Sequence, residues 1–147
     1  MAYGNYGRIG RIIAVTSCKG GVGKSTVSFE LASRLAARGQ RVGLFDADVY
    51  GPSLPSQLPR TFGVSPSEDG WSMLPLAHSG LQLMSFGFLR GKSGQPTWLP
   101  TAEVDPRAAG DPGALAVQLL HTTAWGDLDY LVIDTPPGTG WAAPRSA

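Results

Sequence analysis

Apolar residues occur along this chain in short runs and helical repeats that predict strands and helices in turn. Residues 11–17 are apolar at consecutive positions, as expected of a parallel strand buried on both faces. In residues 26–38 apolar side chains recur at four-residue steps, which predicts a helix with one face on the sheet. That predicted stripe consists of Val27, Leu31, Ala32, Leu35 and Ala36. Gly39 stands where a left-handed residue ends such a helix.

The rest of the pattern continues the alternation. Further strands are predicted at 42–45, 81–85 and 130–133, and a short helix at 114–120. Residues 55–75, rich in proline, serine and glycine, are predicted to form a surface loop. Residues 1–10 are expected to be a flexible lead-in, and 90–113 an irregular insertion. The order predicts an α/β fold with a mostly parallel sheet flanked by helices.

The composition is that of a single globular domain and does not indicate a particular binding partner. The 147 residues suit one domain, and the net charge of +1 argues neither for nor against nucleic acid, which we do not expect as a partner. Neither a membrane-spanning run nor a signal or transit peptide is visible, so we expect no membrane partner. A single cysteine, Cys18, excludes an internal disulfide and agrees with a reducing compartment. We expect the cytoplasm, or a plastid or mitochondrion if the source is eukaryotic.

Between the first predicted strand and helix lies a glycine loop that is typical of phosphate binding. Its candidate nucleotide-binding residues are Gly20, Gly21, Val22, Gly23, Lys24, Ser25 and Thr26. Glycines let successive N–H groups point at an anion, Lys24 can reach the β- and γ-phosphates, and the Ser25 hydroxyl can ligate Mg²⁺. The strict pattern has glycine where this chain has Cys18, which leaves a chance match as the alternative. The flanking strand and helix favour an ATP site.

A second lysine, Lys19, precedes the glycine pair. This deviant form of the loop resembles that of a superfamily of dimerising ATPases. There the lysine crosses the subunit boundary and contacts the partner's nucleotide. The resemblance therefore implies a homodimer and a catalytic role for Lys19. The alternative is a solvated charge on a loop.

Carboxylates follow two of the predicted strands. Asp46 and Asp48 come directly after residues 42–45, at the carboxyl end where open α/β sheets bind ligands. We assign Asp46 to the hydrated Mg²⁺ and Asp48 to the attacking water, with a solubilising turn as the alternative. Asp134 ends the strand 130–133 and is a further candidate for Mg²⁺. In the turn that follows, the N–H of Gly138 is a candidate sensor of the γ-phosphate.

With these motifs placed, the sequence resembles the Mrp-type (ApbC-like) ATPases, which are iron–sulfur cluster carriers. The resemblance rests on 17–26, 45–55, 83–88 and 125–140, and Cys18 together with 118–123 resembles the plastid branch. The run Asp-Val-Tyr-Gly-Pro-Ser separates this family from the partition and division-site ATPases. The resemblance to this family implies roles in binding nucleotide and Mg²⁺ for seven residues: Lys19, Lys24, Ser25, Thr26, Asp46, Asp48 and Asp134.

The chain departs from this family in two places. Residues 98–101 stand where the family has Trp-Arg-Gly-Pro-Met, and the segment up to Trp125 is longer and proline-rich. The family also continues well past Gly140, through the adenine contacts and the Cys-x-x-C that binds the cluster between subunits. This chain has no Cys-x-x-C. A truncated form or a gene-model error would explain both departures, and we expect a partial nucleotide-binding domain over residues 1–147.

The resemblance implies ATP hydrolysis coupled to transfer of an iron–sulfur cluster to apo-protein acceptors. A partition-like regulatory ATPase that binds DNA or membrane is one alternative. The neutral charge balance and the lack of an amphipathic basic helix argue against it. A non-catalytic fragment that binds phosphate or a partner without turnover is the other alternative.

Overall fold

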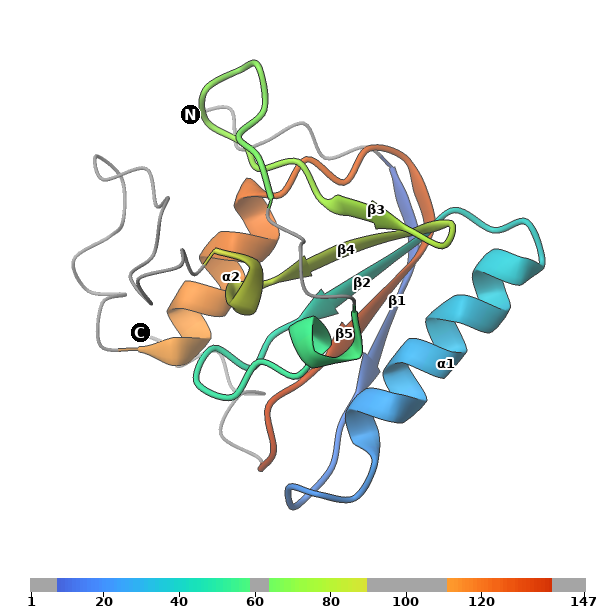
Figure 1. The fold of residues 1–147 in the computed structure, drawn as a ribbon, viewed down its shortest axis with the longest axis vertical. Helices are drawn as coiled ribbons and strands as arrows, with labels where there is room; N and C mark the ends of the chain where they lie inside the picture. The colour runs from blue at the N-terminus through green and yellow to red at the C-terminus, as the bar shows by residue number, and fades with distance from the viewer. Residues whose placement is uncertain (1–7, 59–63, 90–110, 139–147) are drawn as a thin grey trace.

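The computed structural model describes residues 8–58, 64–89 and 111–138, and in them one five-stranded sheet forms the centre of the fold (Figure 1). The strand order is β1-β5-β2-β4-β3. The strands are β1 (Ile9–Val15), β2 (Val42–Asp46), β3 (Leu76–His78), β4 (Leu81–Ser85) and β5 (Leu128–Asp134). Strands β1, β5, β2 and β4 are parallel neighbours, whereas the short edge strand β3 runs antiparallel to β4. The prediction of a mostly parallel sheet is confirmed.

Two α-helices lie on opposite faces of the sheet (Figure 1). Helix α1 (Lys24–Ala37) packs Ala32 on a core that includes Leu44 and Val132. Helix α2 (Pro112–Thr122) packs Ala116 and Leu119 on the other core. Two short 3-10 turns, η1 (Leu54–Gln57) and η2 (Phe86–Phe88), follow β2 and β4 and contact each other. None of the helices in the described ranges is long and apolar enough to cross a membrane.

The core on the α2 side is built around Trp125. Its side chain is fully buried, donates from Nε1 to the carbonyl of Leu120 at 3.1 Å, and meets Phe45 edge-on at 6.3 Å between ring centroids. The side chains of Trp125 and Leu128 come so close to β2 that any residue with a Cβ at position 43 would force them to shift. A Cβ on Gly43 would lie 3.0 Å from Trp125 Cε3 and 2.8 Å from a methyl group of Leu128. Large side chains from three segments therefore fill this face.

The observed elements begin and end close to the predicted ones, with informative exceptions. β1 starts at Ile9, inside the expected lead-in, and residues 1–7 lie outside the described part of the chain. α2 starts at Pro112, so residues 112–113 of the expected insertion are helical, while 90–110 also lie outside that part. The predicted loop 55–75 contains most of η1 and an antiparallel bridge between Pro66 and Met73. β3, which the sequence analysis missed, is only three residues long.

Two burial predictions were wrong. Ile12 is 61% exposed, so β1, an edge strand of the described sheet, is not covered on both faces. Val27 is 56% exposed, and the fully buried positions of α1 are Ser28 and Ala32. Lys24, Ser28 and Ala32 follow one another at four-residue steps, so the face that begins with Lys24 is the one turned to the sheet. The contact that Lys24 makes there is described below.

Candidate functional site

The candidate site lies at the carboxyl edge of the sheet, where four parallel strands end level with one another. Val15 of β1 is paired with Asp134 of β5, Asp134 with Asp46 of β2, and Asp46 with Ser85 of β4. Carboxyl edges of parallel sheets are where α/β proteins bind ligands. The fold thus brings both predicted strand-end carboxylates together from positions 88 residues apart in sequence (134 − 46).

The loop between β1 and α1 has the backbone of a phosphate-binding loop. Gly21 and Gly23 adopt φ angles of +75° and +87°, which side chains with a Cβ rarely adopt. Gly23 is the N-cap of α1 and offers no side-chain hydrogen bond, so no cap side chain occupies the first-turn N–H groups. These N–H groups and the positive end of the helix form a site for an anion. Val22 and Thr26 lie exposed beside them.

Lys24 and Asp134 form an ion pair at the foot of this loop. The Lys24 ammonium donates to Oδ1 of Asp134, and the two side chains are only 10% and 6% exposed. A buried pair of this kind persists because each charge compensates the other's loss of water. The pair joins the phosphate loop to the end of β5, and it explains why the Lys24–Ser28–Ala32 face of α1 is turned to the sheet.

Asp46 is the most heavily hydrogen-bonded carboxylate of the site. Its Oδ1 accepts from the N–H of Asp48 at 3.1 Å. Its Oδ2 accepts from the N–H groups of Ser53 at 2.9 Å and Leu54 at 3.0 Å, and from the Ser85 hydroxyl at 3.0 Å. Both oxygens of this 1% exposed residue thus already have partners within the protein.

Burial is the main influence on Asp46 and raises its pKa above the usual value, because the charged form loses water. The N–H groups of Leu54 and Asp48 and the Ser85 hydroxyl oppose that rise by hydrogen bonding to the charged form. The nearby charge of Asp134 adds to it.

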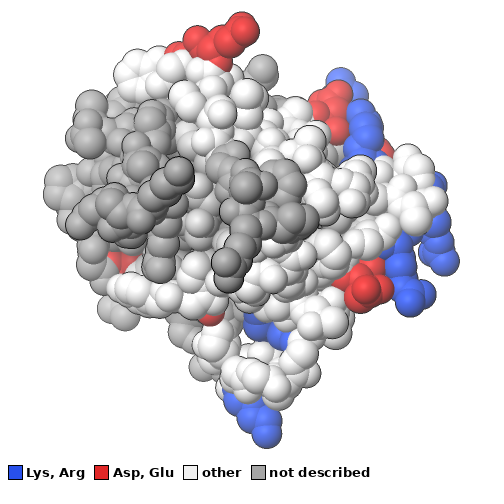
Figure 2. Space-filling view, viewed as in Figure 1, with Lys and Arg blue, Asp and Glu red and all other residues white. Residues whose placement is uncertain are grey.

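The other predicted residues lie around this centre. Asp48 is half-buried, and its Oδ1 accepts from the N–H of Gly51 at 2.9 Å. Gly138 has a φ of +98° and donates its N–H to the carbonyl of Ser17 at 3.1 Å, so the turn after β5 contacts the phosphate loop. Lys19 is exposed on that loop, and Figure 2 shows basic atoms at the lower tip of the molecule, over the β1–α1 loop of Figure 1.

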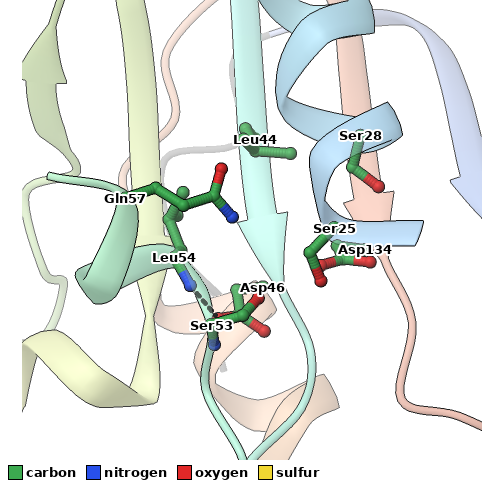
Figure 3. A pocket seen from close by; sticks show the side chains of 8 residues that line it. All are labelled: Ser25, Ser28, Leu44, Asp46, Ser53, Leu54, Gln57 and Asp134. Carbon is green, nitrogen blue, oxygen red and sulfur yellow. Dashed lines mark hydrogen bonds between the residues drawn. The ribbon is translucent and has the colours of Figure 1, made fainter. Parts of the chain in front are cut away.

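A narrow hollow, too tight to hold a water molecule, lies between α1, η1 and the ends of β2 and β5 (Figure 3). It is lined by Ser25, Ser28, Leu44, Asp46, Ser53, Leu54, Gln57 and Asp134. Figure 3 shows Ser25 beside Asp134, with Asp46 turned toward Ser53 and Leu54.

The oxygen donors of this hollow suit Mg²⁺. Mg²⁺ is usually bound by one or two protein oxygens together with water and substrate phosphates, rather than by a full cage of side chains. The Ser25 hydroxyl and the Asp134 carboxylate fit that pattern. Within the described ranges no group of three or more His, Cys, Asp or Glu residues forms a denser metal site.

The residues that hold Asp46 are not among the predicted site residues. The sequence predicts Ser85 only as part of a strand, and it places Ser53 and Leu54 only in the resembling stretch 45–55. The position of Ser85 at the carboxyl end of a strand was a usable signal, since side chains there face the ligand edge. No comparable signal marked the backbone N–H groups of Ser53 and Leu54, because any residue supplies an N–H.

Comparison with known proteins agrees with this geometry. A model of the ParA family, described as the NUBPL iron-transfer P-loop NTPase, matches residues 8–143. The chain is 50% identical over 134 residues to the chloroplastic Fe-S cluster assembly factor HCF101 of Arabidopsis thaliana. It is 45% identical over 129 residues to the iron-sulfur cluster carrier protein of Escherichia coli. These alignments cover 90% and 88% of this chain but only 23% and 32% of the relatives.

A solved structure also resembles this chain in both sequence and fold. A nucleotide-binding protein from Archaeoglobus fulgidus, determined in complex with ADP, is 38% identical and superposes with a TM-score of 0.64. The match covers 90% of this chain and 46% of that one. The chain therefore spans between about a quarter and a half of the length of the proteins that it resembles.

Proposed function

Because the chain belongs to the ParA family of iron-transfer P-loop NTPases, we propose that it binds and hydrolyses ATP as the nucleotide-binding part of an iron–sulfur cluster carrier. The observation that carries the proposal is the meeting of Lys24 and Asp134 below the glycine loop. A lysine of the loop and a carboxylate at the end of a neighbouring strand are the two groups that P-loop enzymes use on the phosphates and the metal.

Each residue has a task that its position supports. The N–H groups of the loop and the first turn of α1 would hold the phosphates, and Lys24 would leave Asp134 to contact the β- and γ-phosphates. Asp48 would orient the water for in-line attack on the γ-phosphate. Ser25 and Asp134 would hold Mg²⁺, which when bound neutralises charge on the phosphate oxygens. The N–H of Gly138 would reach the γ-phosphate after releasing Ser17.

We further propose that the site is completed in a homodimer, with Lys19 of one protomer on the nucleotide of the other. Its exposure at the tip of the loop leaves the side chain available for such a contact. Transfer of an iron–sulfur cluster to apo-protein acceptors is proposed because the relatives are an Fe-S cluster assembly factor and an iron-sulfur cluster carrier protein. The plastid relative and the single cysteine support a reducing compartment, cytoplasmic or organellar.

Lys24→Ala tests the nucleotide site. A hydrogen bond to a charged group contributes about 1.5–3 kcal/mol, so loss of Lys24 should weaken binding of a fluorescent ATP analogue by roughly 10- to 150-fold. Arg34→Ala is the matched control, because it removes an exposed cation from the same helix. Equal affinity of the Lys24 variant and wild type would overturn the proposal. Tight binding with no turnover at any protein concentration would favour a non-catalytic nucleotide-binding module.

Lys19→Ala tests the dimeric site. Nucleotide affinity at low protein concentration should stay within about twofold, because an exposed lysine at the loop tip contributes little to its own site. ATP hydrolysis per protomer, which in wild type should rise with protein concentration, should fall and lose that rise. A variant with wild-type turnover at every concentration would show that Lys19 is a solvated loop charge.

A further inference from the structure

We propose that Asp46 is a positioning residue that acts together with Ser85 to hold Asp48 in place, an inference that rests on the ATPase function proposed above. Asp46 would touch neither water nor phosphate. It would act through the loop 47–54, which carries Asp48 and joins β2 to η1. This differs from the role as a magnesium ligand that the sequence alone suggested.

The hydrogen bonds of Asp46 attach both ends of that loop to one carboxylate. At the near end, the N–H of Asp48 donates to Oδ1. At the far end, the N–H groups of Ser53 and Leu54 donate to Oδ2. Carboxylates that accept several backbone N–H groups make strong, charge-assisted bonds. Residues 48–54 therefore form a loop, which we call the hoop, that is closed by hydrogen bonds to one carboxylate.

Asp48 sits inside this hoop and is fixed from two sides. Its own N–H is bound to Asp46, and its Oδ1 accepts from the N–H of Gly51 at 2.9 Å. Tyr50, next to Gly51, is 72% exposed and makes no comparable anchor. Ala47 and Val49, on either side of Asp48, pack on the α2-side core. This packing and the hydrogen bonds to Asp46 and Gly51 together fix the Asp48 carboxylate.

Ser85 extends the same network to the neighbouring strand. Its hydroxyl donates to Asp46 Oδ2 and accepts from the N–H of Gly87 at 3.1 Å. Gly87 lies against Pro55 of η1, where a Cβ would clash with the proline ring. The turns after β2 and β4 are therefore joined through one fully buried hydroxyl and one buried carboxylate.

The hydrogen bonds that the Asp46 carboxylate already accepts make it a poor direct ligand for a metal. Oδ2 already accepts from three donors, more than its two lone pairs, and Oδ1 accepts from one. Mg²⁺ bound directly at Oδ2 would displace these donors and free the far end of the loop that bears Asp48. Asp134, which lies beside Ser25, would give up only its contact with Lys24 and would leave the loop in place.

The experiment compares Ser85→Ala and Asp46→Asn with Thr123→Val. The first removes one donor and leaves Asp46 charged, whereas the second turns an NH₂ group toward N–H donors at one end of the loop. The control Thr123→Val also deletes a buried hydroxyl that makes a hydrogen bond, at the end of α2. Steady-state ATP hydrolysis, the magnesium dependence of nucleotide affinity and amide hydrogen exchange at residues 48–54 are measured on each.

Loss of positioning should lower kcat roughly 10- to 100-fold, as displacements of about 1 Å do, while KM stays within about threefold. Amide exchange at 48–54 should rise in both site variants and not in Thr123→Val. Magnesium dependence should not change. Wild-type kcat in Ser85→Ala, or loss of magnesium dependence in Asp46→Asn, would overturn this inference alone. A wild-type protein without nucleotide binding or turnover would overturn the proposed function instead.

Discussion

At the scale of single residues, the two charges of the Lys24–Asp134 pair depend on each other. Both side chains are largely withdrawn from water, so either one left alone would be an uncompensated buried charge. The proposed entry of phosphates changes that balance, because a phosphate can replace Asp134 as the partner of Lys24. Asp134 then becomes free for the metal. Under the proposed function the same carboxylate would compete with the nucleotide before binding and assist it afterwards.

Asp134→Asn should separate these two effects. In the absence of Mg²⁺, affinity for the nucleotide should be equal to or higher than that of wild type, since no carboxylate competes for Lys24. Addition of Mg²⁺ should then strengthen binding much less than it does in wild type. Titrations of a fluorescent ATP analogue with and without Mg²⁺ measure both, and Asp127→Asn, an exposed carboxylate at the opposite end of β5, is the control.

The contrary result would be a variant that keeps the full magnesium effect. That outcome would remove Asp134 from the metal site and leave it as a structural partner of Lys24. Circular dichroism should accompany the titrations, because removal of one partner of a buried pair costs about 3–5 kcal/mol of stability.

At the scale of elements, the end of the sheet opposite the candidate site is held by surface ion pairs. Arg41 contacts Asp129 through its guanidinium at 2.9 Å and through its N–H at 2.8 Å. The Arg41 side chain, followed by its backbone N–H, lowers the pKa of Asp129 from 3.8 to about 2. Arg41 also lies 3.9 Å from Asp127, so one arginine joins the start of β2 to the start of β5.

This pKa predicts an acid-dependent loss of stability. The pKa of Asp129 is lower in the folded than in the unfolded chain, so its contribution is present above pH 4 and is lost as the pH falls from about 4 to 2. In wild type the denaturant concentration at the midpoint of unfolding should fall as the pH drops from about 4 to 2, and in Asp129→Asn it should fall less. Glu30→Gln, which removes an exposed carboxylate of α1, should behave like wild type. If Asp129→Asn lost stability at acid pH as steeply as wild type, the exposed contact between Arg41 and Asp129 would contribute nothing measurable to stability.

The elements show which parts of the fold were accessible from sequence. The runs 42–45 and 130–133 are apolar, short and followed directly by Asp, so strand type and site edge could both be predicted. The rotation of α1 could not, because it follows from the contact of Lys24 with a residue 110 positions away. Nor could the anchoring of the Asp48 loop, which depends on backbone N–H groups that leave no trace in residue identity.

At the scale of the whole molecule, the number of cysteines limits what this 147-residue chain can carry. Iron–sulfur clusters are usually held by four cysteine thiolates. The chain has only Cys18, exposed on the phosphate loop, so a symmetric dimer offers two thiols, each beside a proposed nucleotide site. Bound ATP would compete with a cluster for that space, and its phosphates would repel a thiolate.

The 147-residue chain should therefore bind nucleotide but hold no stable cluster, even after anaerobic reconstitution with iron and sulfide. Iron and sulfide quantification, with a visible absorption spectrum of the desalted protein, measures this. A Cys18→Ser variant carried through the same procedure defines the background of adventitious iron. Four irons per dimer with cluster absorption that survives Cys18→Ser would show that ligands other than cysteine suffice, and the argument from ligand count would fail. Cluster absorption that disappears in Cys18→Ser and on addition of ATP would instead show that this loop cysteine binds a cluster in competition with nucleotide.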